Sequence, residues 1–312
     1  MSIKQHTSKC LIDVFQDYKR HRVLKPKTIC TYDHVLRTGL ADWLYLPLNE
    51  INGQMVYQRH AELSKQAPHL ADLTFRVLRA IFKWASAYYE DETGEAIITR
   101  NPVDKITGLR VWNGSSRRQG RIRAKDMSAW YASVQGLKDT LVKDWLLTIL
   151  FTGCRKMEIS KLRWEHIDFT EGTITIIQDN SKNGKAHVIP MSDFLWDLMS
   201  RRYERSSKTS WVFPSRTLLD THISESERGH YTVINETGIE FTIHDLRRTF
   251  SSIGTDLKIN EYQVKKLMNH SGKGDVTYGY YIGDIEALRE SVQMITDEIL
   301  NQANNSKYDK AS

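Results

Sequence analysis

The stretch TGCRKMEISKLRWEHID, residues 152–168, marks the point at which the chain changes from helices to strands. It predicts a helix that begins near Arg155, buries Ile159 and Leu162, and then leads into a strand. Glu158 lies one turn after Arg155 and is therefore able to orient its guanidinium. Taken alone, these two side chains favour a structural ion pair over a functional site.

The residues after this stretch predict a hairpin, and helices surround it. Two short β-branched runs, GTITIIQD and KAHVIPM, lie on either side of NSKNG, residues 180–184, which is a turn signal. Helical periodicity marks AKDMSAWYASV from near Asp126, DTLVKDWLLTILFTG to near Gly153, SDFLWDLMSRRYE, TIHDLRRTFSSIGTDL and NEYQVKKLMN. We therefore predict a second half that is mainly α with a small antiparallel sheet.

The first half is predicted to be all-helical. Helical spacing covers residues 8–23, 54–66 and 70–90, with the turn or breaker signals LKPKT, APHL and DETGE around them. In the third segment the expected core side is formed by Leu70, Leu73, Val77, Ile81 and Trp84. Another face carries Arg76, Arg79 and Lys83. A basic stripe is ordinarily a solvated face, but this spacing also allows the three cations to straddle phosphates.

Composition limits the class of protein. The chain has 312 residues, enough for two ordinary domains, with average apolar and charged fractions. Its longest apolar runs, such as WLLTIL, are far shorter than a membrane span, and the N-terminus has no hydrophobic signal region. Cys10, Cys30 and Cys154 are odd in number and widely separated, which fits neither a disulfide framework nor a zinc site. We expect a cytosolic protein with reduced thiols and no membrane partner.

The net charge of +6 is concentrated in one segment. Residues 111–125 hold five Lys or Arg and no acid, together with the Gly and Ser residues of a linker. The basic residues are Arg117, Arg118, Arg121, Arg123 and Lys125. The segment is either a flexible connector or a contact for a polyanion. It divides the chain into a helical domain, 1–110, and a second domain, 126–312.

Four separate stretches hold polar groups where the local pattern favours apolar ones. Each has an ordinary explanation when taken alone: an ion pair, a solubilising turn lysine, a hydrogen-bonded helical His, or a helix cap. The residues are Arg155, Lys182, His244, Arg247 and His270. Together with a phenol they suit phosphoryl transfer from a nucleic-acid backbone, because arginines hold non-bridging oxygens and stabilise transition-state charge. The sequence has no acidic cluster of the two-metal kind and no Gly-rich phosphate loop, so we expect neither a metal nor a cofactor.

The order of these motifs resembles the tyrosine recombinase or phage integrase family across about residues 145–285. The motifs are TGCRKMEISKLRWEHID, NSKNGKAHVIPM, HDLRRT, and LMNHSG followed by a tyrosine. The resemblance implies a helical, SAM-like core-binding domain in the first half and a tyrosine-recombinase catalytic domain in the second. It implies an active site formed by Arg155, Lys182, His244, Arg247, His270 and a tyrosine, with Glu158 in support. Lys185 is a weaker match, because the family's lysine is the first one in the turn.

Three tyrosines compete for the role of nucleophile. The family commonly has a threonine three residues before the nucleophile, and Thr277 stands three before Tyr280. The family's tyrosine usually falls nine residues after the second histidine, whereas Tyr280 is ten after His270. One inserted loop residue would explain the difference, because such insertions cost little. The resemblance therefore assigns Tyr280, with Tyr281 and then Tyr278 as alternatives.

The resemblance further implies the reaction and its partners. Tyr280 would attack a DNA phosphate to give a 3′-phosphotyrosyl link and a free 5′-hydroxyl, without ATP. The implied partners are double-stranded DNA attachment sites and further copies of the chain in a homotetramer, in the cytoplasm of a bacterial host. An accessory DNA-bending or excision factor is a further partner that the sequence leaves open. Phosphate contacts are expected from Arg76, Arg79, Lys83 and the five basic linker residues.

Three alternatives stay open at this stage. The C-terminal helix ESVQMITDEIL is expected either to dock on a neighbouring subunit or to pack on its own domain. A type IB topoisomerase would share the nucleophile but relax supercoils without exchanging partners. A non-catalytic DNA-binding regulator would keep the basic surface and lose the active site.

Overall fold

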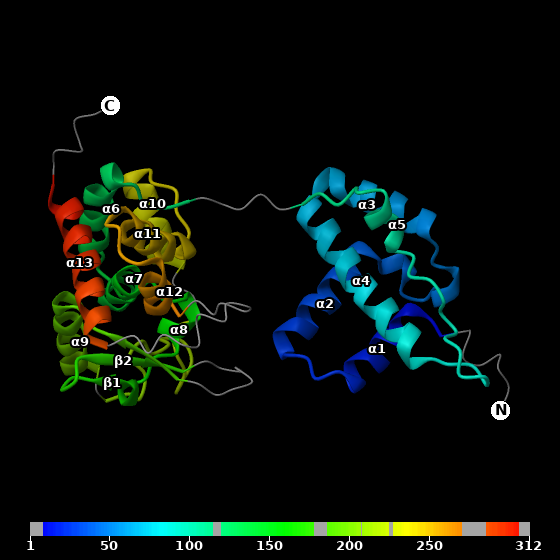
Figure 1. Cartoon of the computed structure of the whole chain (residues 1–312), viewed down its shortest axis with the longest axis horizontal. Coiled ribbons are helices and arrows are strands. Elements are labelled where there is room, and N and C mark those ends of the chain that lie inside the picture. Colours follow the sequence, from blue (N-terminus) through cyan, green and yellow to red (C-terminus); the bar gives the residue numbers. More distant parts are fainter. Residues whose placement is uncertain are drawn as a thin grey trace. The chain divides into compact units, whose positions relative to one another are not determined.

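The computed structural model describes residues 9–114, 120–177, 186–206, 208–224, 227–269 and 285–305. The chain forms two compact units, Met1–Arg117 and Arg118–Ser312 (Figure 1). The described residues are mainly helical, with a small three-stranded antiparallel sheet in the second unit. This confirms the predicted fold class.

The first unit is assembled around one long helix, α4. Its described helices are α1 (Leu11–His21), α2 (Pro26–Gly39), α3 (Gly53–Gln66), α4 (Pro68–Tyr88) and α5 (Asp104–Gly108), with 3-10 turns at Ala41–Trp43 and Leu48–Glu50. α4 packs against α1, α2 and α3. The core includes Leu11, Phe15, Leu36, Phe75 and Phe82, all at most 2% exposed. Burial of such side chains contributes roughly 1.5–3 kcal/mol each. The face of α4 with Phe75 and Phe82, packed against α1, α2 and α3, therefore holds the unit together.

The interpretation of LKPKT as a turn or breaker signal is wrong, because a helix begins within it. Pro26 stands in the first turn of α2. A proline there loses an amide that has no intrahelical partner anyway, and its fixed φ suits a helix. Pro68 has the same position in α4. Both prolines therefore begin helices.

The buried face of α4 also differs from the expected one. Val77 and Ile81 are buried as predicted, but Leu73 is 37% exposed, so its assignment to the core is wrong. The fully buried positions are instead continued by Phe75 and Leu78. Leu73 and Arg76 are three residues apart and share one face of a helix. Leu73 thus lies toward the basic face.

The second unit combines helices with the small sheet. Its described helices are α6 (Ala124–Gly136), α7 (Thr140–Thr152), α8 (Lys156–Ser160), α9 (Asp193–Ser206), α10 (Glu227–Thr237), α11 (Ile243–Asp256), α12 (Glu261–Leu267) and α13 (Ile285–Asn304), with a 3-10 turn at Trp164–His166. The strands are β1 (Ile167–Asp168), β2 (Thr173–Ile176) and β3 (His187–Pro190), in the order β1-β2-β3. β2 and β3 pair antiparallel with Ile174 opposite Ile189. The predicted strands therefore pair, and the turn NSKNG between them lies outside the described residues.

α7 is the central helix of this unit, because it is buried on nearly all sides. Leu146, Ile149 and Leu150 are fully buried, as the run WLLTIL requires. α11, α13, α6, α8 and α9 all contact it. α7 ends where Gly153 takes a left-handed conformation, φ 62°, as expected for a C-terminal glycine. α10 lies in a segment for which no helix is predicted.

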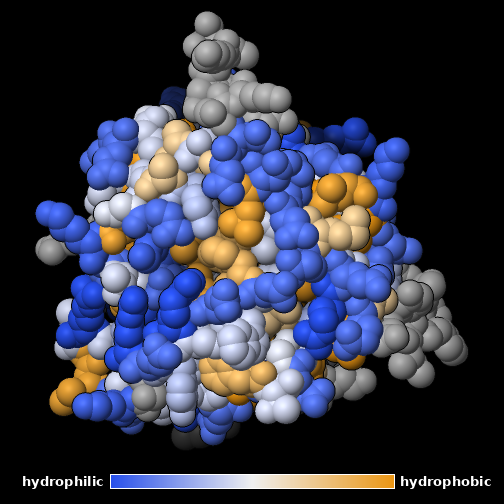
Figure 2. Space-filling model, turned by 90° about the vertical axis from the view of Figure 1, so that its left-hand side faces the viewer, coloured by the Kyte–Doolittle hydropathy of each residue, from blue (hydrophilic) through white to orange (hydrophobic). Residues whose placement is uncertain are grey.

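The C-terminal helix packs on its own unit in this structure. α13 contacts α6, β3, α11 and α12. Its buried side chains include Leu288, Val292, Ile295 and Ile299. The face of the second unit seen in Figure 2 is mostly hydrophilic, with hydrophobic groups in small separate patches. Of the two alternatives for this helix, the structure shows the intramolecular one.

Among the described residues, no helix is both long enough and apolar enough to cross a bilayer.

We predict that Gly153→Ala lowers the free energy of unfolding by about 2–4 kcal/mol. A Cβ at Gly153 would lie 2.5 Å from Cδ1 of Phe250, in a backbone conformation that L-residues avoid. Gly136→Ala is the matched control, because nothing lies within 4 Å of its Cβ and its φ is not positive. Urea unfolding measures both. Equal stabilities of the two variants would contradict the prediction.

Candidate active site

Arg155 lies where α7 ends and α8 begins. Its backbone N–H donates to Oε2 of Glu158 at 2.8 Å, and its Nη1 donates to Oε1 of Glu158 at 2.7 Å. The same Nη1 donates to the carbonyl of Asn269 at 3.0 Å. Because the Arg155 side chain remains 44% exposed, the carboxylate orients a guanidinium that solvent can still reach.

Arg247 is the buried partner of this arginine. It is 4% exposed and comes from α11. Its Nη1 donates to the carbonyls of Gly153 at 2.8 Å and Met268 at 2.6 Å. Burial, and then the charge of Arg155, lower the pKa of Arg247 from its usual value. The structure therefore brings two guanidiniums close together at the end of α12.

The thiol of Cys154, between Gly153 and Arg155, carries no charge. Cys154 is fully buried. Burial, assisted by the charge of Glu158, raises the pKa of Cys154 to about 12. The thiol is thus neutral and unreactive, and it acts as a small apolar side chain in the wall of the site.

His244 stands in the first turn of α11, three residues before Arg247, and is exposed. Partial burial, then the charges of Arg248 and Arg247, lower its pKa from the ordinary value. The charge of Arg155 acts in the same direction, which places that guanidinium nearby. A neutral imidazole at neutral pH is able to accept a proton.

Asp245 fixes the turn that carries His244. Its Oδ2 accepts hydrogen bonds from the N–H and the hydroxyl of Thr242, both at 2.8 Å. Its Oδ1 accepts from Arg248 at 2.7 Å. This is an N-terminal cap that holds the helix start rigid, so the backbone that carries His244 has a defined position.

The remaining catalytic predictions lie outside the described residues. They are Lys182, its alternative Lys185, His270, and the tyrosines 278, 280 and 281. The structure brings Arg155, Arg247 and His244 together and leaves those predictions as they stand.

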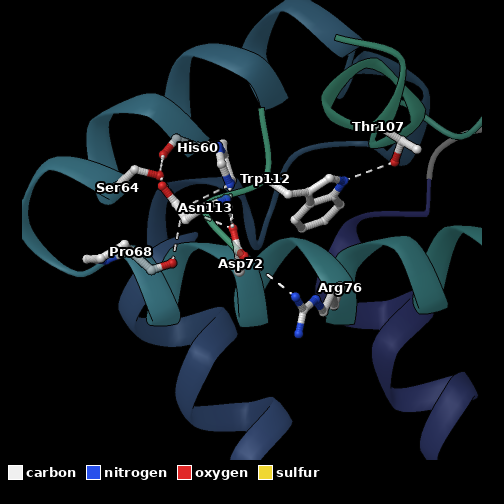
Figure 3. A network of polar contacts seen from close by, with 8 residues as sticks. All are labelled: His60, Ser64, Pro68, Asp72, Arg76, Thr107, Trp112 and Asn113. Carbon is white, nitrogen blue, oxygen red and sulfur yellow. Dashed lines mark hydrogen bonds and ion pairs between the residues drawn. The ribbon is translucent and has the colours of Figure 1, made fainter. Parts of the chain in front are cut away.

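The basic face of α4 is exposed at all three predicted positions, Arg76, Arg79 and Lys83. Arg79 pairs with Asp104 at 3.3 Å. Arg76 lies 5.7 Å from the ring of Trp112 and 3.6 Å from Oδ2 of Asp72. Figure 3 shows this arrangement. The guanidinium of Arg76 is therefore held over the surface of α4 and does not extend freely into solvent.

Next to Arg76, a polar network surrounds the buried side chain of Asp72 (Figure 3). Asp72 is 3% exposed, and its Oδ1 lies 2.9 Å from Nε2 of His60. The same oxygen accepts from the backbone N–H of Asn113 at 3.1 Å and from its side-chain amide at 3.0 Å. That amide also donates to Ser64 and to the carbonyl of Pro68. Asn113 thus fixes the start of the interdomain segment to α3 and α4.

The far end of that segment packs on α11. The N–H of Ile122 donates to Thr249 at 2.9 Å, and Arg121 hydrogen-bonds Ser252. Arg121 also lies 3.7 Å from Asp256, and Arg123 lies 3.4 Å from Asp126. Lys125 is exposed on α6, and Arg117 and Arg118 lie outside the described residues. Arg121 and Arg123 therefore have acidic neighbours that would compete with a phosphate.

Sequence reasoning missed the backbone acceptors of the site, which are the carbonyls of Gly153, Met268 and Asn269. Such contacts leave no side-chain signature. Asn269, at φ 53°, had a usable signal, because asparagine is one of the few residues that tolerate the left-handed region. Among the described residues, no group of three or more His, Cys, Asp or Glu side chains is arranged to hold a metal ion.

Comparisons with known proteins identify the family to which this chain belongs. Residues 120–283 match the model of the phage integrase family. Because this match covers more than half of the chain, the protein belongs to the phage integrase family.

Relatives of the chain are integrases of bacterial and phage origin. It is 23% identical over 268 residues to prophage integrase IntF of Escherichia coli (strain K12), covering 85% of this chain and 56% of the relative. It is 29% identical over 198 residues to prophage integrase IntZ of the same strain, covering 60% and 44%. The chain thus spans about half the length of the curated relatives it matches.

Two solved structures share the fold. A lambda integrase dimer bound to a COC′ core site matches with a TM-score of 0.67 at 21% identity, over 90% of this chain and 79% of that chain. The Tn1549 transposon integrase in complex with a circular intermediate DNA matches with a TM-score of 0.70 at 16% identity, over 97% and 98%. The architecture of both units is therefore that of integrases of known structure.

We predict that Arg248→Gln raises the pKa of His244 toward its ordinary value. The substitution removes a nearby positive charge and leaves Asp245 without that partner, and both changes favour the imidazolium. Titration of the His244 C2 proton by NMR measures the shift. Arg163→Gln, on another element, is the control and should leave the titration unchanged. An unchanged pKa of His244 in Arg248→Gln would show that the charge of Arg248 does not lower that pKa, and would contradict the prediction.

Proposed function

We propose that this protein is a site-specific DNA recombinase that cuts and rejoins DNA strands through a 3′-phosphotyrosyl intermediate. The observation that supports this most is the convergence of Arg155 and Arg247 on the end of α12. Two guanidiniums beside one another repel, and a phosphate with two non-bridging oxygens relieves that repulsion. Because the chain belongs to the phage integrase family, we propose that this phosphate is part of a DNA backbone.

In the proposed reaction the Tyr280 oxygen attacks the scissile phosphorus and the bond to the 5′-oxygen breaks. His244 assists removal of the phenolic proton, and Lys182 protonates the leaving 5′-oxygen. Arg155 and Arg247, helped by His270, stabilise the charge on the phosphoryl oxygens. The ester bond to the enzyme retains the energy of the broken bond, so attack by a 5′-hydroxyl of the partner strand rejoins DNA without ATP.

The proposed partners are duplex attachment sites and three further copies of the chain. One matching lambda integrase structure is a tetramer bound to a Holliday junction, and we extend that assembly to this protein. We propose that residues 1–110 form a core-binding domain whose face with Arg76, Arg79 and Lys83 contacts DNA phosphates. The linker cations Arg121, Arg123 and Lys125 would also contact the DNA backbone, Arg121 and Arg123 after leaving Asp256 and Asp126.

The host setting is part of the same proposal. Because the relatives are prophage integrases, we place the protein on DNA in the bacterial cytoplasm, where it integrates or excises a mobile element. An accessory DNA-bending or excision factor would set the direction of the reaction.

Covalent trapping tests the function. Wild type and the variants Tyr278→Phe, Tyr280→Phe and Tyr281→Phe are incubated in EDTA with nicked duplexes that carry the candidate attachment sequence. We expect an SDS-resistant protein–DNA adduct that only Tyr280→Phe abolishes. Tyr231→Phe is the matched control, because Tyr231 is exposed on α10.

The other outcomes distinguish the alternatives. Loss of the adduct only in Tyr281→Phe would keep the function and move the nucleophile by one residue. Supercoil relaxation without strand exchange between duplexes would indicate a topoisomerase. No adduct in any protein, on DNA that is demonstrably bound, would contradict the proposed function and favour a DNA-binding regulator.

A further inference from the structure

The end of α12 carries the acceptors that hold both arginines. α12 ends at Leu267, and the carbonyls of Met268 and Asn269 follow. They accept from Arg247 at 2.6 Å and from Arg155 at 3.0 Å. Carbonyls at a helix C-terminus lack intrahelical partners and carry partial negative charge, so they attract cations. We call these two carbonyls the α12 clamp.

Asn269 also links the α12 clamp to α8 through Glu158. It is 7% exposed and has φ 53°. Its side-chain amide lies 3.4 Å from Oε1 of Glu158, the oxygen that also accepts from Arg155 at 2.7 Å. The three residues therefore close a ring in which Asn269 contacts Arg155 directly through its carbonyl and indirectly through Glu158.

His187 contacts the same helix end from the sheet. It is the first residue of β3 and pairs with Ile176 of β2. Burial lowers the pKa of His187, and nearby backbone groups of Leu267 and Lys266 partly oppose that shift. Its Nε2 is buried and has no hydrogen-bond partner among the described residues. A half-buried, neutral imidazole thus lies near the last turn of α12.

We infer that Asn269 and His187 are positioning residues, which hold the α12 clamp so that Arg155 and Arg247 point at one phosphate. This inference rests on the proposed function. Neither side chain is assigned a chemical step. Their effect is geometric, since displacement of reacting groups by about 1 Å can slow a reaction about 100-fold.

The test compares variants at the two ends of α12. Asn269→Ala removes the amide and disfavours the left-handed backbone, whereas Asn269→Gly removes only the amide. Asn260→Ala is the matched control, because Asn260 caps the start of the same helix by accepting from the N–H of Tyr262 at 2.8 Å. His187→Phe keeps a ring and removes its contacts with the α12 backbone.

The readouts are the single-turnover rate of adduct formation on saturating nicked DNA, the Kd for that DNA, and the melting temperature. We expect Asn269→Ala and His187→Phe to slow adduct formation about 10- to 100-fold with Kd within about twofold. Asn269→Gly should fall between Asn269→Ala and wild type. Asn260→Ala should lower the melting temperature and keep the rate within about twofold.

Two results would overturn the inference. One is a rate for Asn269→Ala within about twofold of wild type, and the other is an equal loss of rate in Asn260→Ala, which would indicate general destabilisation of α12.

A measurement without DNA separates this inference from the proposed function. The Nε–H NMR signals of Arg155 and Arg247 should shift in Asn269→Ala and stay in place in Asn260→Ala. Unshifted signals in Asn269→Ala would overturn the clamp even if the wild type forms adducts. Shifted signals would support it even if the wild type forms none, in which case only the proposed function fails.

Discussion

The guanidinium of Arg247 joins three helices of the second unit. It extends from α11 to the carbonyl of Gly153 after α7 and to the carbonyl of Met268 after α12. A cation that is 4% exposed costs several kcal/mol to bury unless its donors are satisfied. The helix ends that satisfy Arg247 therefore cannot separate without leaving a buried charge unpaired. Gly153 makes this approach feasible, because any side chain there would collide with Phe250.

The same geometry places two positive charges close together near the surface. Arg155 and Arg247 lie close enough for one charge to lower the pKa of the other, and Glu158 forms a 2.7 Å ion pair with Arg155. Arg155 is 44% exposed, so the open side of the pair is accessible to an anion. Groups that are already oriented toward developing charge need little reorganisation during a reaction. A rigid, cationic site of this kind is suited to phosphoryl transfer.

Much of this unit could be predicted from local sequence signals. The β-branched runs around NSKNG predicted strands β2 and β3, and the three-residue spacing predicted the ion pair between Arg155 and Glu158. In the first unit, α2 was missed because Pro26 looks like a breaker although it begins a helix. The contacts of Arg247 could not be predicted, since its acceptors are backbone carbonyls 94 and 21 residues away in sequence. Buried polar contacts of that kind depend on how helices pack, which periodicity alone does not specify.

The most direct measurement of the role of the two arginines is a comparison of two DNA substrates. Single-turnover cleavage is measured for wild type, Arg155→Gln and Arg247→Gln on a nicked duplex with an ordinary scissile phosphate, and on one with a neutral methylphosphonate there. If the arginines stabilise phosphoryl charge, each variant should lose about 100- to 1,000-fold on the phosphate and less than about tenfold on the methylphosphonate, which carries no such charge. An equal loss on both substrates, in variants that melt like the wild type, would contradict this role.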